Sequence, residues 1–479
     1  MRIFDTNVQK LKYKVLVEVA WQTWRGKDSF AVFNEIANEI VKKDEPPMSC
    51  CVYKDRAIVA ERIRIALGGN KNNSNVIQVI DIACDECPVA GHVVTDLCRG
   101  CVAHRCKDVC KLNAITFDDD QRATIDKIKC VECGKCAKVC PYTAIVNFKR
   151  PCEIACKPKA ISMAEGGEAQ IDDEKCIACG ACVYQCPFGA TVDTSSIVDI
   201  INTIMESDNN KKYKVYAVVA PSISTQFTYS KLGQVITAIK QLGFHAVNEA
   251  ALGADMVAYN EAQELLEKGF LTTSCCPAFV KYVKTNFPEL EENISHNLSP
   301  MATLGKFIKE HDPEAKIVFI GPCTAKKAEV KLDHVKEYID YAMTFEELQA
   351  VIDSKDIIVE DLPESEMDHA SYYGRIFART GGVTAAVAEA IDELGKDSFE
   401  FNPVVCEGID KCKPALMRAS KGVLPNNFIE GMACMGGCVG GAGCLSHGAA
   451  DKKGIDAYGE SATGKEITQV INDADKIFD

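Results

Sequence analysis

Cysteines at metal-binding spacing are the residues with which this sequence could do chemistry. Cys434 and Cys438 stand four residues apart in residues 430–443, which read EGMACMGGCVGGAG. Two upstream stretches, TSCCP and GPCTAKKAE, contribute Cys276 and Cys323. Thiolates bind the iron of iron–sulfur clusters, and glycine permits positive φ and close approach of a bulky inorganic group to the backbone. Cysteines from three distant loops are therefore expected to converge on one cluster.

Two further cysteine runs have the C-x2-C-x2-C-x3-C-P spacing of bacterial ferredoxins. They comprise Cys130, Cys133, Cys136 and Cys140, and then Cys176, Cys179, Cys182 and Cys186. In such runs the first three thiolates bind one cubane and the fourth binds the other. The sequence therefore predicts one 4Fe-4S cluster on Cys130, Cys133, Cys136 and Cys186, and a second on Cys176, Cys179, Cys182 and Cys140. Zinc is disfavoured because its sites usually use two C-x2-C pairs.

A degenerate half of the same run occurs twice more. Cys106-x3-Cys110 and Cys152-x3-Cys156 are each followed, after three intervening residues, by Ala-Ile, which indicates that an older ferredoxin unit received another. The crossed rule then predicts a third 4Fe-4S cluster on Cys98, Cys101, Cys106 and Cys156. The remaining cysteines of this region could complete a fourth: Cys84, Cys87, Cys110 and Cys152. The alternative is that these four are relics that pack as small apolar residues.

The three late stretches together resemble the L1, L2 and L3 signatures of the iron-only (FeFe) hydrogenases, TSCCP, PCxxKxxE and MxCxxGCxxGG. The resemblance covers roughly the last 270 residues and implies an H-cluster, a 4Fe-4S cubane joined to a two-iron subcluster with CO, CN and azadithiolate. By resemblance the cubane is held by Cys276, Cys323, Cys434 and Cys438, and Cys438 also bridges to the subcluster. The family also implies two α/β lobes with the active site between them.

The resemblance assigns roles to residues around this cluster. Lys326 would donate to an iron-bound cyanide, and the positions next to the cluster match Pro221, Ser222, Phe377 and Met432. Positions that match the family's proton relay are Cys275, Glu261, Ser295 and Glu264. Cys275 has a thiol whose unperturbed pKa lies near 8.5. For the two glutamates a solvated helix face remains the alternative reading. The sequence differs from the best-known members of the family at Gly321, Ala278-Phe279 and Gly441-Ala-Gly-Cys444. These differences leave open how tight the pocket is and how well the protein tolerates oxygen.

Composition bounds the class of protein. A chain of 479 residues is too long for one ordinary core, and 47% hydrophobic with 25% charged residues is typical of soluble globular proteins. No apolar run approaches the roughly 18 residues of a membrane span, and a net charge of −14 argues against nucleic acid. The N-terminus lacks the layout of a secretory signal, so a cytoplasmic location is expected. In that reducing compartment 26 cysteines indicate metal ligands rather than disulfides.

The expected organisation is an α+β and α/β multidomain protein. Residues 1–80 form a helical region, in which Asp28 caps a helix that ends at Pro46-Pro47 and a second helix covers residues 55–67. Residues 81–195 form a cysteine-rich, ferredoxin-like domain with two to four clusters. Residues 210–479 form the catalytic domain, with buried parallel strands at 214–220 and 315–320.

The leading interpretation is an enzyme that interconverts protons and electrons with dihydrogen. The resemblance implies electrons from ferredoxin or flavodoxin, passed through 4Fe-4S clusters, and help from hydrogenase maturation proteins. Two alternatives stay open: a sensory or regulatory H-cluster protein, and an iron–sulfur assembly protein descended from hydrogenases. Retention of Cys275, Lys326, Glu329 and Cys438 favours the enzyme. The sequence assigns no role to Cys50, Cys51, Cys406, Cys412 and Cys444.

Overall fold

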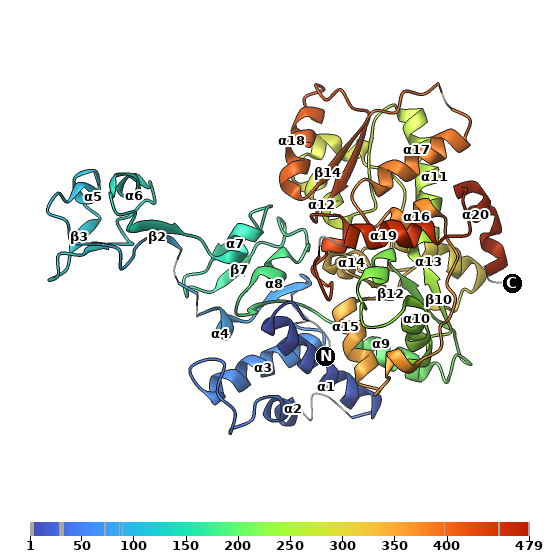
Figure 1. Cartoon of the computed structure of the whole chain (residues 1–479), viewed down its shortest axis with the longest axis horizontal. Coiled ribbons are helices and arrows are strands. Elements are labelled where there is room, and N and C mark those ends of the chain that lie inside the picture. Colours follow the sequence, from blue (N-terminus) through green and yellow to red (C-terminus); the bar gives the residue numbers. More distant parts are fainter. Residues whose placement is uncertain are drawn as a thin grey trace.

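The computed structural model describes all residues except 1–3, 28–32, 71–72, 86, 89, 397, 449–450 and 478–479. Figure 1 shows a larger body, helices near the N-terminus in blue, and a cysteine-rich arm that extends away to one side. Helices and strands are mixed throughout, as predicted. Within the described ranges, no helix is long and apolar enough to cross a membrane.

The N-terminal region is helical, with α1 (Asn7–Trp24), α2 (Phe33–Ile40) and α3 (Val52–Ala66). Thr6 caps α1 by accepting a hydrogen bond from the backbone N–H of Gln9, whose side chain accepts one from Thr6 N. The second predicted helix is confirmed as α3, which stops before Gly68 and Gly69 at positive φ. Helix α2 ends before the predicted stop at Pro46-Pro47, and Asp28 lies outside the described residues.

Two parallel sheets form the framework of the body. The strand order of the first sheet is β10 (Ala246–Glu249), β9 (Val215–Val219), β12 (Lys316–Gly321) and β13 (Tyr341–Thr344). The order of the second is β11 (Leu271–Thr272), β15 (Phe428–Met432) and β14 (Pro403–Glu407). Every residue of β9 is buried, which is why this strand is a continuous apolar run. The two strands predicted in this region are confirmed as β9 and β12.

Helices cover these sheets. In chain order they are α9 (Ile197–Glu206), α10 (Leu232–Gln241), α11 (Ala250–Lys268), α12 (Pro277–Asn286), α13 (Pro300–His311), α14 (Thr324–Glu329), α15 (Phe345–Asp353), α16 (Tyr372–Ile376), α17 (Gly382–Glu393), α18 (Ile409–Ala419), α19 (Asp451–Glu460) and α20 (Ile467–Asp473). Helix α11 packs against α13, α16, α17 and α20. Its alanine-rich sequence allows that close packing on several sides, which places part of α11 in the core.

The arm consists of two units of the same plan, one inserted into the other. We call residues 91–148 the outer unit, and residues 77–87 with 151–193 the inner unit. In the outer unit β2 (Gly91–Val94) pairs antiparallel with β5 (Ile145–Phe148). In the inner unit β1 (Ile77–Val79) pairs antiparallel with β8 (Thr191–Asp193). The predicted insertion is thus confirmed, and the boundary expected at residue 80 moves to before Ile77.

Each unit carries short helices and one hairpin between its paired strands. The outer unit holds α5 (Arg105–Asp108), the hairpin β3 (Ile115–Phe117) and β4 (Ala123–Ile125), and α6 (Lys135–Val139). The inner unit holds α4 (Asp81–Cys84), α7 (Pro151–Ala155), the hairpin β6 (Ile161–Met163) and β7 (Ala169–Ile171), and α8 (Ala181–Gln185).

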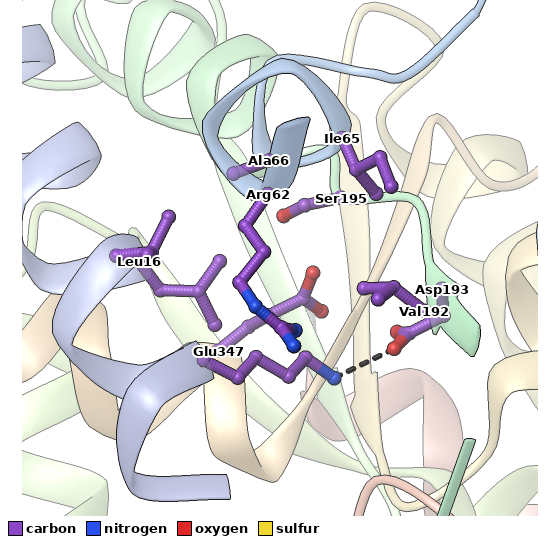
Figure 2. Close-up of a pocket in the computed structure, with 10 residues that line it drawn as sticks. Leu16, Arg62, Ile65, Ala66, Val192, Asp193, Ser195 and Glu347 are labelled. Carbon is purple, nitrogen blue, oxygen red and sulfur yellow. Dashed lines mark hydrogen bonds and ion pairs between the residues drawn. The ribbon is translucent and has the colours of Figure 1, made fainter. Parts of the chain in front are cut away.

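Asp193, the last residue of β8, joins the inner unit to two other parts of the chain. Its carboxylate lies 2.6 Å from Lys12 Nζ of α1 and 2.6 Å from Lys327 Nζ of α14. These lysines also pair with Glu346 and Glu347 of α15, both at 2.8 Å. Figure 2 shows Asp193 and Glu347 at the pocket between these segments. The dashed line that ends at Asp193 marks its ion pair with Lys12, which carries no label. Burial alone would raise the pKa of Asp193, but Lys12 and Lys327 outweigh it and lower that pKa. The inner unit is therefore fixed to the body.

Candidate active site

The cysteines assigned to one cluster follow parallel strands at their carboxyl ends. Cys276 lies beyond β11, Cys323 directly beyond β12, and Cys434 and Cys438 in the loop after β15. Ligands of parallel α/β sheets commonly bind at that edge. Burial, followed by the charge of Cys276, raises the pKa of Cys323 to about 11. Burial, followed by the charge of Cys323, raises the pKa of Cys438 to about 12. The four thiols are thus close together, and a metal would be needed to hold them as thiolates.

A cavity of about 90 Å³ lies beside these cysteines. A single water needs only about 10–15 Å³ of such space, so the cavity has room for a small polyatomic group. Most of its lining is apolar, including four prolines, which offer no backbone N–H. Its polar side chains are Cys275, Cys276, Cys323, Lys326 and Cys438. In so apolar a site the charge of Lys326 acts at low effective dielectric and attracts an anionic group strongly.

Lys326 is held in the cavity wall by the first turn of α14. Its Nζ lies 2.6 Å from Glu329 Oε2 and donates to the backbone carbonyl of Cys275 at 3.4 Å. Burial alone would lower the pKa of Lys326, but the carboxylate of Glu329 outweighs burial and raises it. Lys326 is therefore a permanent cation at the cavity, as its expected role requires.

The predicted relay residues form a line from the cavity wall toward the surface. Cys275 lines the cavity, and burial followed by the charge of Glu261 raises its pKa well above the ordinary value, so it is a thiol. Glu261 on α11 is fully buried and accepts hydrogen bonds from Ser274 N at 3.2 Å and Ser274 Oγ at 3.3 Å. Burial raises the pKa of Glu261 to about 7, against the opposing hydrogen bonds from Ser274 and Ser295.

The outer end of this line reaches solvent. Asn297 Nδ2 donates to both Ser295 Oγ at 3.0 Å and Glu264 Oε2 at 3.1 Å, so the two residues share a neighbour. Glu264 also pairs with Lys268 and His296 at 2.8 Å each, near the surface. The solvated-face alternative is wrong for Glu261, which is buried, whereas Glu264 does reach the surface.

The other predicted residues divide into two groups. Pro221, Phe377 and Met432 line the cavity. Ser222 lies behind it in the turn after β9, fully buried, and its hydroxyl has no hydrogen-bond partner among the described residues. Cys434 is partly buried near the other three thiols and does not line the cavity. Unpartnered polar atoms are rare in buried positions, so the Ser222 hydroxyl is available to a bound group.

Phe319 is a cavity residue that sequence reasoning missed. A Cβ at Gly321 would stand 2.6 Å from the Phe319 ring, so the glycine makes room for the ring in the cavity wall. In the sequence, Gly321 stood out only as a departure from the family. The signal that could have located Phe319 was a large and a small residue two positions apart on β12. The glycines after β15 also serve packing: a Cβ at Gly441 would meet Pro322 O at 2.5 Å. There the close neighbour is another loop of the chain.

Comparison with known proteins agrees with this site. Residues 213–442 match the family described as the iron only hydrogenase large subunit, C-terminal domain, and residues 97–144 and 169–191 match a 4Fe-4S dicluster domain and a 4Fe-4S binding domain. The chain is an FeFe-hydrogenase-like protein. The hydrogenase-like match contains all of the cavity-lining cysteines.

This FeFe-hydrogenase-like protein is 30% identical over 293 residues to iron hydrogenase 1 of Clostridium pasteurianum, covering 49% of this chain and 50% of that one. It is 30% identical over 262 residues to the periplasmic Fe hydrogenase large subunit of Nitratidesulfovibrio vulgaris, covering 44% and 62%. The chain thus spans half to three fifths of these relatives. A solved structure of FeFe-hydrogenase HydA1 from Chlamydomonas reinhardtii aligns with a TM-score of 0.48 and 20% identity over 57% of this chain and 93% of that one.

The accessory cysteines of the FeFe-hydrogenase-like protein are grouped differently from the predicted crossed pairing. A cavity of about 240 Å³ in the outer unit is lined by Cys110, Cys130, Cys133 and Cys136. A second, of about 20 Å³ in the inner unit, is lined by Cys156, Cys176, Cys179 and Cys182. The prediction that Cys186 joins the first set, and Cys140 the second, is wrong. The reason is that each unit closes on itself through its paired first and last strands, so the crossing stays within a unit.

The predicted third set changes in the same way. Burial raises the pKa of Cys106, and the charges of Cys101 and Cys140 add to that rise, so Cys140 lies near Cys106, whereas Cys156 lines the cavity of the inner unit. In the part of the chain that the structure describes, no three His, Cys, Asp or Glu side chains lie close enough to hold a single metal ion.

The inner unit packs directly on the active-site loops. Thr324 Oγ1, next to Cys323, donates to Ala178 O at 2.7 Å. A Cβ at Gly180 would stand 2.6 Å from both Thr324 Oγ1 and Ala442 Cβ. Burial and the nearby charge of Cys323 both act on the pKa of Cys179, which is raised to about 12. The Cys176 to Cys182 loop therefore adjoins the cysteines of the active site.

Proposed function

We propose that this protein catalyses the reversible reaction 2 H⁺ + 2 e⁻ to H₂ at an H-cluster. One observation carries the proposal: four partly buried thiols that follow strands of two sheets gather at or beside an apolar cavity whose lining includes one cationic side chain, Lys326. Such a site suits a cluster that carries anionic cyanide ligands. In this proposal the two sheets, with the thiols beyond their carboxyl edges, would belong to the two lobes expected for the family.

Four cysteines would hold the cubane: Cys276, Cys323, Cys434 and Cys438. Cys438 lines the cavity, as do Cys276 and Cys323, and the family resemblance assigns to Cys438 the bond that would be shared with a two-iron subcluster. When bound, the cofactor supplies the iron site at which protons and electrons combine. The protein's part is to exclude water with the apolar wall, and to offer Lys326 and the Ser222 hydroxyl as donors.

Protons would reach the cavity through the line of exchangeable groups described above. Cys275 stands at the cavity as a thiol, and Glu261 behind it has a pKa of about 7, so the glutamate is poised to give and take protons near neutral pH. Glu261 Oε2 has no hydrogen-bond partner among the described residues. Ser295 and Glu264 continue the route outward.

Electrons would arrive through the arm. The outer unit carries nine Lys and Arg against seven Asp and Glu, although the chain has a net charge of −14. It also exposes Val102 and Ile128, each 97% accessible. A slightly positive unit with exposed apolar side chains, in an otherwise acidic chain, suits an acidic electron carrier, which supports ferredoxin or flavodoxin as the partner. A cytoplasmic location and the need for hydrogenase maturation proteins belong to the same proposal.

The test is hydrogen evolution by the full chain, produced anaerobically together with hydrogenase maturation proteins. A low-potential dye should drive steady hydrogen production, and Cys438→Ser should abolish it while most accessory iron remains. Protein that holds a complete cofactor but turns over at a negligible rate would contradict the enzyme and favour the sensory interpretation. Protein that never accepts the two-iron subcluster would favour the assembly interpretation.

A further inference from the structure

Four cysteines of the inner unit come together outside the sets described above. Three of them, Cys84, Cys87 and Cys152, lie outside both matched 4Fe-4S families, and the fourth is Cys186. We propose that these four cysteines bind a fourth accessory 4Fe-4S cluster, and that the inner unit is a two-cluster domain whose first cysteine motif is split by the outer unit. This inference does not depend on the hydrogen chemistry proposed above.

The first support is the shared plan of the two units. In the outer unit the order is a strand, a C-x2-C pair at Cys98, a C-x3-C pair at Cys106, a hairpin, and a complete run that leads to the closing strand. The inner unit has the same order, but residues 88–151 separate its C-x2-C pair at Cys84 from its C-x3-C pair at Cys152. When the two segments of the inner unit are counted together, the inner unit has as many cluster cysteines as the outer unit.

The second support is a repeated turn at the last cysteine of each C-x3-C pair. Cys110 and Cys140 each accept a hydrogen bond on Sγ from the backbone N–H four residues on, at 3.4 Å. Cys156 and Cys186 accept the equivalent bonds at 3.1 Å. In every case the residue before that N–H has positive φ: Asn113, Thr143, Lys159 and Gly189. Hydrogen bonds to sulfur are typical of cluster ligands, so Cys186 has the local structure of one.

The third support is the convergence of the four side chains. Cys84, Cys152 and Cys186 are buried together in one cluster of apolar side chains with Ile80 and Ala190. Burial, followed by the charge of Cys186, raises the pKa of Cys152 to about 11. Burial raises the pKa of Cys87; the charge of Arg150 opposes this rise, and the charge of Cys186 adds to it. Ala169 N also donates to Cys84 Sγ at 3.3 Å, as a cluster ligand would require.

The fourth support is a buried cation. The side chain of Arg150 is 2% exposed and donates to Cys84 Sγ at 3.7 Å, Pro88 O at 3.2 Å and Cys87 O at 3.3 Å. Among the described residues, no carboxylate forms an ion pair with its guanidinium. An unpaired buried charge is strongly unfavourable, so an anionic partner is expected at this point. A 4Fe-4S cluster with four thiolates has a net negative charge and fits it.

The position of this set gives the cluster a role. Arg150 and Pro88 belong to the two connections between the units, so the set lies at their junction. On its other side Cys182 packs against the same apolar cluster, and Cys152 is among the charges that act on Cys182. A cluster here would carry one electron at a time from the outer unit to the cluster that adjoins the active site.

The first experiment is iron and acid-labile sulfide analysis, with Mössbauer spectroscopy, on full-length protein reconstituted anaerobically without maturation proteins. Five cubane sites should bind about 20 irons. Cys87→Ser with Cys152→Ser should lose about four of them, whereas Cys50→Ser, which lies outside all of the sets, should lose none. An unchanged iron content in the double variant would overturn the proposal. A variant lacking Cys276 reports separately on the active-site cubane, so failure there is distinguishable.

The second experiment keeps all cysteines and so does not depend on the stability of cysteine variants. Arg150→Gln should leave the iron content unchanged and lower the reduction potential of one cluster in an EPR-monitored titration, because reduction adds negative charge that the guanidinium stabilises. Arg150→Lys should largely restore the potential. Arg122→Gln in the exposed part of the outer unit is the matched control. Identical titrations for Arg150→Gln and the wild type would contradict a cluster beside Arg150.

Discussion

Electrons and protons would reach the active site through regions built in different ways. On the electron side, the inner-unit loop packs on the start of α14, next to Cys323, where Thr324 Oγ1 donates a hydrogen bond to Ala178 O. On the proton side, Cys275 and Glu261 form a line of individual exchangeable groups. Electron transfer requires a short distance, whereas proton transfer requires an exchangeable group at every step. The electron side should therefore depend on packing, and the proton side on single atoms.

The largest effect is expected on the proton side, at Cys275. Cys275→Ser should leave the cofactor in place and slow hydrogen evolution by about 10² to 10⁴-fold, because a hydroxyl is a far weaker acid than the thiol. The loss should be the same with a dye and with a protein donor, since electron delivery is intact. Cys406→Ser, a buried cysteine of β14 that does not line the cavity, is the control. Unchanged turnover in Cys275→Ser would remove this residue from the proton route.

On the electron side, the corresponding prediction concerns the stability of the fold rather than the rate of hydrogen evolution. Asp193→Ala leaves Lys12 and Lys327 without their shared carboxylate and should destabilise the fold by about 3–5 kcal/mol. Chemical denaturation of the cluster-loaded protein measures this loss. Asp126→Ala removes a partly exposed carboxylate that directly follows β4 in the outer unit and pairs with Lys129, and should cost much less. Equal losses for the two variants would show that the ion pairs do not anchor the inner unit.

The pH dependence of stability tests the buried state of Glu261. Its pKa is raised to about 7, so between about pH 4.5 and 7 the folded protein holds a proton that the unfolded chain has released. Stability contributed by this group is present at low pH and is lost as the pH rises through that window. Glu261→Gln should remove the slope and gain up to about 3 kcal/mol relative to wild type at pH 8. Parallel stability curves for the two proteins would show that Glu261 is not buried as described.

The smallest effect is expected at the far end of the arm. Val102→Glu with Ile128→Glu places negative charge at two exposed apolar positions of the outer unit and should raise the KM for ferredoxin about tenfold. Turnover with a small dye should not change. Met205→Glu, an exposed apolar residue of α9 in the body, should leave both donors unaffected. An unaltered KM for ferredoxin would place the docking surface elsewhere.

Local sequence signals predicted much of the active site. Strands β9 and β12 could be predicted because buried parallel strands are continuous apolar runs, and Ser222 and Cys323 follow their carboxyl ends. The crossed pairing failed because it depends on which strands close each unit. That information lies in β1 and β8, which are more than a hundred residues apart.

Ion pairs between residues far apart in the chain also could not be predicted from the sequence. The ion pair of Lys12 with Asp193 joins residues separated by 181 positions, and nothing local marks either residue as buried. Arg150 likewise resembles a surface residue in the sequence, because its sulfur neighbour Cys84 is brought to it only by folding. Phe319 illustrates a third limit, since its place in the cavity wall follows from the missing side chain at Gly321.

Infrared spectroscopy of the matured protein tests the central claim most directly. Metal-bound carbonyl and cyanide stretches should be present in the wild type. They should be absent from Cys438→Ser, which should keep most of its accessory iron because Cys438 lies in the body rather than in the arm. Carbonyl and cyanide bands that persist unchanged in Cys438→Ser, or that never form in fully matured wild type, would contradict an H-cluster at this cavity.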